Sequence, residues 1–176
     1  MSRILVLAAH PDDETLGCGA TLAKLSLEGH HIRLLTFTDG VGARNNHSAS
    51  RSRQLDKLCD ILGIEDYICG TFPDNRLDTA PLLEICKFIE KDFTPDIIFT
   101  HHPSCLNIDH SIVSRATLTS FRPQDGVHQE IYSYYVPSST DYNPLSNFSG
   151  NTYFDVGTFV DKKLNALKEC YDEEMR

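Results

Sequence analysis

Two clusters of histidine and aspartate lie far apart in the chain, at residues 10–14 (HPDDE) and at residues 101–110 (HHPSCLNIDH). Adjacent carboxylates beside an imidazole repel one another unless a cation or protons lie between them, so the clusters favour a bound metal ion. Two neutral imidazoles, one carboxylate and a water form a common ligand set for catalytic zinc, and this set also resembles the iron(II) facial triad. Such an ion makes hydroxide available near neutral pH and polarises a substrate carbonyl, while a spare aspartate moves protons.

A structural role competes with this chemistry at the first cluster. Asp12 and Asp13 would suit the positive end of a helix, and proline is common at a helix start. Helix capping therefore explains HPDDE in isolation about as well as a functional site does. A buried structural histidine could explain one histidine of the second cluster, but it does not explain why histidine and aspartate are enriched in both clusters.

The elements that position these clusters follow from the hydrophobic pattern. Short apolar runs alternate with segments of helical period, which predicts an α/β fold: one Rossmann-like domain with a mostly parallel sheet and helices on both faces. Strands are expected at residues 3–9, 31–38, 66–70, 96–101 and 131–136, and helices at about 15–27, from 51, from 82, from 109, and at about 161–174. In the common strand order 3-2-1-4-5, strands one and four are neighbours, so both clusters would face one ligand-binding crevice.

Composition narrows the class of partner. The chain has 176 residues, 40% of them hydrophobic, which suits one compact domain. Its net charge of -9 repels phosphate backbones and anionic lipid, so we expect a small-molecule substrate, no nucleic acid and no membrane. Six cysteines without a C-x-x-C pair, and no evident signal peptide or spanning segment, predict reduced, buried thiols in a cytoplasmic protein.

Both clusters resemble motifs of the PIG-L or LmbE-like zinc-dependent N-acetyl-sugar deacetylases. Residues 9–14 (AHPDDE) are similar to that family's hallmark, and residues 107–110 (NIDH) to its second metal motif. Weaker similarities lie at residues 38–40, 51–55, 72–76 and 136–140. The resemblance implies a hydrolase that removes the N-acetyl group from an amino sugar or from its glycoside or nucleotide derivative. It also implies one zinc ion per chain, with Fe²⁺ or another divalent metal as the alternative.

The resemblance implies roles for residues of both motifs. His10, Asp13 and His110 would hold the zinc. Asp12 would be the general base that activates the metal-bound water and later protonates the leaving amine. Asp109 would orient His110 from behind.

Substrate contacts are implied at two further positions. Arg51 and Asp74 would bind sugar hydroxyls or a charged aglycone, although each could equally be a solvated surface charge. Many family members place an oxyanion-stabilising histidine where this chain has Asn107. The oxyanion would therefore be stabilised by the Asn107 amide, by His102, or by the zinc alone.

Departures from the family pattern qualify the resemblance. Cys105 and Ser111 stand where relatives commonly have an acid and an arginine. Relatives generally continue beyond the segment 164–176, so residues 1–176 are expected to form a single deacetylase domain shortened at its C-terminus. The apolar stripe of the last helix could then be buried in a homo-oligomer.

Rival functions remain open from the sequence. The segment Gly17-Cys18-Gly19 suggests a non-hydrolytic Rossmann-like domain that binds a nucleotide sugar. These glycines fall inside the first predicted helix, and Leu22 replaces the third glycine of the fingerprint, so close helix packing explains them better. A metal phosphoesterase would usually need more ligands and basic residues. An inactive, truncated family member is the third alternative.

Overall fold

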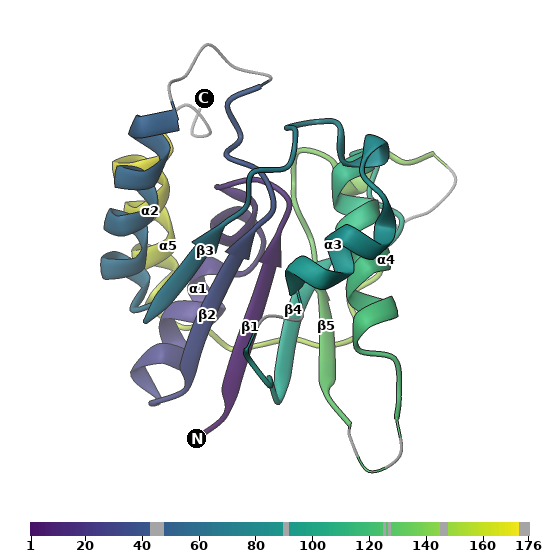
Figure 1. Cartoon of the computed structure of the whole chain (residues 1–176). Coiled ribbons are helices and arrows are strands. Elements are labelled where there is room, and N and C mark those ends of the chain that lie inside the picture. The colour runs from purple at the N-terminus through teal and green to yellow at the C-terminus, as the bar shows by residue number, and fades with distance from the viewer. Residues whose placement is uncertain (43–47, 90–91, 125, 127, 145–147, 173–176) are drawn as a thin grey trace.

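A five-stranded parallel sheet in the order β3-β2-β1-β4-β5 forms the centre of the molecule (Figure 1). The computed structural model describes residues 1–42, 48–89, 92–124, 126, 128–144 and 148–172, and for residues 48–52 it describes the backbone alone. The strands are β1 (Arg3–Ala8), β2 (His31–Thr36), β3 (Asp66–Cys69), β4 (Ile97–His101) and β5 (Glu130–Tyr134). The α/β fold and the strand order predicted from the sequence are confirmed.

Helices cover both faces of the sheet. One face carries α1 (Asp13–Leu27), α2 (Ser48–Leu62) and α5 (Phe159–Cys170), and the other carries α3 (Leu82–Ile89) and α4 (Ile108–Ser120) (Figure 1). Two short 3-10 helices lie in the connections: η1 (Leu77–Thr79) between β3 and α3, and η2 (Thr140–Tyr142) between β5 and α5. Helix α5 ends four residues earlier than expected because Tyr171 leaves the helical conformation and buries its ring completely.

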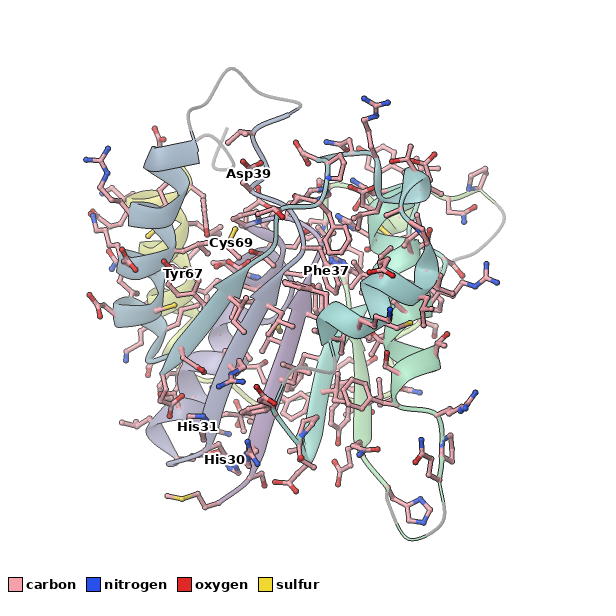
Figure 2. The ribbon with its side chains drawn as sticks, viewed as in Figure 1. His30, His31, Phe37, Asp39, Tyr67 and Cys69 are labelled. Atoms are coloured by element: carbon pink, nitrogen blue, oxygen red, sulfur yellow. The ribbon has the colours of Figure 1, made fainter. Side chains whose placement is uncertain are left out.

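Strand β1 is buried on both faces, which explains its unbroken apolar sequence. Side chains alternate along a strand, so Ile4, Val6 and Ala8 face the core under α1, α2 and α5, while the residues between them face the core under α3 and α4. Figure 2 shows Phe37 on the α3 side, where its ring lies 5.2 Å from that of Phe88.

Composition predicts reduced, buried cysteines and no segment that spans a membrane, and the structure describes both features. All six cysteines are free thiols, and all except the partly exposed Cys69 are buried. Figure 2 shows Cys69 on the α2 side of the sheet. Among the described residues, no helix is both long enough and apolar enough to cross a bilayer.

Parallel strands bring all their carboxyl ends to one edge of the sheet. Figure 2 shows Asp39, which follows β2, at this edge, whereas His30 and His31 lie at the opposite edge. Because β1 pairs directly with β4, the segments that follow these two strands are neighbours. The residues of the two histidine and aspartate clusters therefore leave the sheet side by side.

Gly17 in the first helix allows close packing, the explanation that the sequence favoured. A Cβ atom at Gly17 would lie 2.2 Å from Cδ2 of Tyr134, whose ring is buried and whose hydroxyl donates to the carbonyl of Leu7. Because this ring is anchored, the residue at position 17 cannot carry a side chain without displacing it. Gly17 and Gly19 sit within α1 and not in the turn before it, so they do not form a phosphate-binding loop.

We expect Gly17→Ala to lower the free energy of unfolding by about 1–3 kcal/mol, the usual cost of overpacking a core. Gly19→Ala is the matched control, since its new Cβ would lie 3.3 Å from Cγ2 of Thr15 and both changes gain the same helix propensity. Urea denaturation of the two variants measures the difference. Equal stability of the two variants would show that the contact with Tyr134 does not restrict position 17.

Candidate metal centre and active site

Three side chains from the two clusters converge at the carboxyl edge of the sheet. His10 follows β1, Asp13 opens α1, and His110 lies in the first turn of α4. One ligand atom from each lies within 4.8 Å of the other two. Nδ1 of His10 is 3.2 Å from Oδ2 of Asp13, and Nε2 of His110 is 3.2 Å from Oδ1 of the same carboxylate. The structure thus brings the three predicted metal ligands together, each no more than 9% exposed.

The turn between β1 and α1 sets the direction of the Asp12 side chain. Asp12 has φ of 130°, a region that non-glycine residues rarely occupy. Its backbone N–H donates to Oε2 of the buried Glu14, and its carbonyl accepts from the N–H groups of Thr15 and Leu16. Asp12 occupies the N-cap position of α1, yet its side chain makes no capping hydrogen bond and lines a cavity instead. Capping therefore does not explain this carboxylate.

The other ring nitrogen of His10 contacts two further carboxylates. Its Nε2 lies 3.2 Å from Oδ2 of Asp109 and 3.3 Å from Oδ1 of Asp74. Asp109 is fully buried and accepts a hydrogen bond from the backbone N–H of Leu77 through its other oxygen. A neutral His10 that donates Nε2–H to Asp109 presents the lone pair of Nδ1 to Asp13. The sequence-based assignment of Asp109 to His110 is corrected: Asp109 contacts His10, because the first turn of α4 directs the two side chains to different partners.

His110 presents a buried nitrogen to the same point. Its Nδ1 is 3.2 Å from Sγ of Cys105, while its Nε2 has no hydrogen-bond partner among the described residues. A buried nitrogen is costly to leave unpaired, and this one lies beside a carboxylate oxygen of Asp13. Two imidazole nitrogens and a carboxylate, each oriented by a neighbour, fit a divalent cation with further positions open for water and substrate.

The pKa values reflect the same clustering of carboxylates. Burial lowers the pKa of His10, but hydrogen bonds to Asp109 and Asp13 outweigh it and raise the pKa to about 10. Burial also opposes protonation of His110, whose pKa the charge of Asp13 raises to about 9. Burial raises the pKa of Asp13, yet the charge of His110 and the hydrogen bond with His10 hold it well below its ordinary value. Without a cation, protons on the histidines balance the carboxylate, and a divalent cation would replace those protons.

A cavity of about 250 Å³ opens onto this cluster. Carboxylate, amide and hydroxyl groups form most of its wall, and no lysine or arginine lines it among the described residues. The lining residues are His10, Asp12, Asp13, Leu16, Gly40, Asp74, Asn75, Asn107, His110, Ser138 and Ser139. Such a wall favours a cation and neutral polar groups over a phosphate.

The predicted oxyanion and substrate residues have different placements. Asn107 lines the cavity and caps α4, because its Oδ1 accepts the backbone N–H of Asp109; its NH₂ group is thus the part that could donate to a substrate. His102 does not line this cavity: it lines the neighbouring one, where its ring lies 5.2 Å from that of Phe148. Asp74 lines the cavity. Arg51 lies in α2, but its side chain falls outside the described part of the chain.

Two contributors to the site have no assigned role in the sequence analysis. His101 is fully buried, accepts the backbone N–H of Ala9 through Nε2, and stacks on His110 with ring centroids 3.9 Å apart. Burial lowers the pKa of His101 well below its ordinary value, so it forms a neutral wall behind the cluster. Ser139 lines the cavity from the segment after β5. Position at a strand end is the signal for His101, whereas Ser139 has only the weak similarity of residues 136–140.

The fold and this site together define a doubly wound α/β protein with a candidate metal centre at the topological switch point of its sheet. Residues 5–121, which include both clusters, match the PIG-L family, described as GlcNAc-PI de-N-acetylase. The chain belongs to this family, as the resemblance in its motifs indicated.

Relatives in sequence support this assignment, and a solved structure shares the fold. The chain is 31% identical over 147 residues to the uncharacterized deacetylase YaiS of Escherichia coli K12, covering 77% of this chain and 75% of YaiS. It is 38% identical over 97 residues to the 1D-myo-inositol 2-acetamido-2-deoxy-alpha-D-glucopyranoside deacetylase of Thermobifida fusca. That match covers 45% of this chain and only 34% of the relative. The N,N'-diacetylchitobiose deacetylase of Pyrococcus horikoshii shares the fold, with a TM-score of 0.75, 21% identity, and coverage of 94% of this chain and 68% of that one.

Proposed function

We propose that this protein is a metal-dependent hydrolase that removes the N-acetyl group from an amino sugar or its glycoside, releasing acetate and the free amine. The observation that carries the proposal is the convergence of His10, Asp13 and His110, from two distant parts of the chain, within 4.8 Å at the floor of an open cavity. Membership of the PIG-L family supports the reaction class. The names of the Thermobifida fusca and Pyrococcus horikoshii enzymes support an N-acetylated sugar as substrate.

His10, Asp13 and His110 would hold the ion, for which zinc suits the ligand set, and Fe²⁺ is the alternative. When bound, a divalent cation makes water nucleophilic near neutral pH and polarises the amide carbonyl of a substrate. Asp109 would accept a hydrogen bond from the Nε2 proton of His10, so that Nδ1 is free to ligate.

Asp12 would transfer the protons. Its carboxylate lies in the cavity wall and is 6% exposed, so it can reach a substrate while remaining shielded from bulk water. It would accept a proton from the attacking water and return that proton to the amide nitrogen as the C–N bond breaks. The NH₂ group of Asn107 would donate to the carbonyl oxygen as negative charge develops there.

The other polar groups of the cavity would bind the sugar. Asp74, Asn75 and Ser138 line the wall and offer acceptors and donors for ring hydroxyls. Arg51 is proposed as a further substrate contact on the strength of the family resemblance alone. Because four aspartates lie at or beside this cavity and no basic residue lines it among those described, a phosphorylated substrate is disfavoured.

Acetate release tests the proposal directly. The purified chain is incubated with N,N'-diacetylchitobiose, a GlcNAc–inositol glycoside and free N-acetylglucosamine, each with and without a chelator. We expect turnover of at least one sugar, loss of turnover on chelation, and recovery on addition of zinc. Turnover that a chelator leaves unchanged would contradict the metal dependence, and bound metal with no turnover of any sugar would favour the inactive family member.

A further inference from the structure

A cysteine lies directly behind His110, on the side away from Asp13. Cys105 is 6% exposed, and its Sγ lies 3.2 Å from Nδ1 of His110, 3.1 Å from Oγ of Ser139 and 3.7 Å from Oγ1 of Thr140. Its backbone N–H donates to the carbonyl of His102, which fixes the loop that carries it. The thiol is thus enclosed by polar groups from two segments of the carboxyl edge of the sheet.

The directions of these hydrogen bonds leave one role for the sulfur toward His110. The hydroxyl of Thr140 donates to Sγ, and the thiol donates its own proton to Ser139. The single thiol proton is therefore used, so Sγ meets Nδ1 of His110 as an acceptor at 3.2 Å. Oγ of Ser139 is a second, more distant neighbour of the same nitrogen, at 3.4 Å. His110 then carries its proton on Nδ1, and the lone pair of Nε2 faces Asp13.

We propose that Cys105 is the positioning residue for His110: its sulfur fixes the ring and the tautomer that present Nε2 to the metal ion. This inference rests on the proposed metal centre. The family resemblance implied this role for Asp109, but Asp109 contacts His10. Sulfur is a weaker hydrogen-bond acceptor than a carboxylate oxygen, so Cys105 makes His110 a less basic ligand than an acid at position 105 would.

Metal affinity of the unloaded protein tests the inference without any enzyme assay. The dissociation constant for Zn²⁺ is measured by competition with a chromophoric chelator. We expect Cys105→Ala to raise this dissociation constant about 10–100-fold, the usual effect of losing the partner of a ligating histidine. Cys105→Asp should restore tight binding, because a carboxylate accepts Nδ1–H more strongly than sulfur does.

Cys86→Ala is the matched control. Cys86 is 5% exposed and its thiol donates to the carbonyl of Ala116 in the core under α3 and α4, far from the cluster along the chain. Cys86→Ala also removes one buried sulfur atom and should leave zinc affinity unchanged. Thermal unfolding reports whether each variant is folded. If Cys105→Ala does not fold, Cys105→Ser replaces it. Its zinc affinity is expected to be lower than that of the wild type and higher than that expected for Cys105→Ala.

The outcomes separate this inference from the proposed function. Equal zinc affinity in wild type and folded Cys105→Ala would overturn the positioning role while leaving the metal centre intact. Failure of Cys105→Asp to bind more tightly than Cys105→Ala would also overturn it. A wild-type protein that binds no zinc would instead refute the proposed function itself.

Discussion

Replacing Asp12 by asparagine is expected to lower kcat/KM for N-acetyl hydrolysis by about 10²–10⁴-fold, the contribution of a positioned general base. Metal content should not change, because Asp12 is not among the three converging ligands. Asparagine keeps the shape of the side chain and tolerates positive φ, so the backbone at φ 130° is preserved. Acetate release and zinc content are measured on the same preparation.

Asp78→Asn is the control for this change, since it removes the same charge from an exposed aspartate in η1. It should leave the rate close to that of the wild type. An Asp12→Asn enzyme of normal rate would show that another group moves the proton. A variant that lost its zinc together with its activity would identify Asp12 as a ligand.

Replacing the neighbouring Asp13 by asparagine is expected to give the opposite signature. Its carboxylate contacts both His10 and His110 and is the only anionic member of the three-residue group. Removing one charge from a buried, paired cluster costs about 3–5 kcal/mol, so the dissociation constant for Zn²⁺ should rise at least about 100-fold. Chelator competition measures that constant for Asp13→Asn and Asp12→Asn together.

Comparison of these adjacent variants separates the two roles. Asp12→Asn should retain zinc and lose turnover, whereas Asp13→Asn should lose both at low zinc concentration. Zinc affinity that is equal in Asp13→Asn and in the wild type would remove Asp13 from the ligand set.

The hydrophobic pattern predicted the fold well because burial controls it. Strand β1 is apolar from Ile4 to Ala8 since it is covered on both faces there, and the predicted ends of all five strands lie within two residues of the observed ones. Helix α2 begins three residues before its predicted start, and α5 ends four residues before its predicted end. The end of α5 depends on the burial of Tyr171 against other elements, which local periodicity does not report.

The convergence of His10, Asp13 and His110 could be predicted from the sequence, whereas the contacts that support each of them could not. His10, Asp13 and His110 meet because β1 and β4 are adjacent, which the strand order alone required. Which side chain supports each histidine depends on the rotation of α4 against the sheet. Asp109 and His110 are consecutive, yet one contacts His10 and the other contacts Cys105. Spacing in the sequence could not distinguish these partners. It also could not predict that His102 lines the neighbouring cavity.

The central claim is that His10, Asp13 and His110 share one divalent cation. Anomalous scattering at the zinc absorption edge, from a crystal of the zinc-loaded protein, tests it most directly. The account predicts one strong peak per chain, within bonding distance of a nitrogen of each histidine and an oxygen of Asp13. A peak bound by other residues, or no peak at this position at saturating zinc, would contradict it.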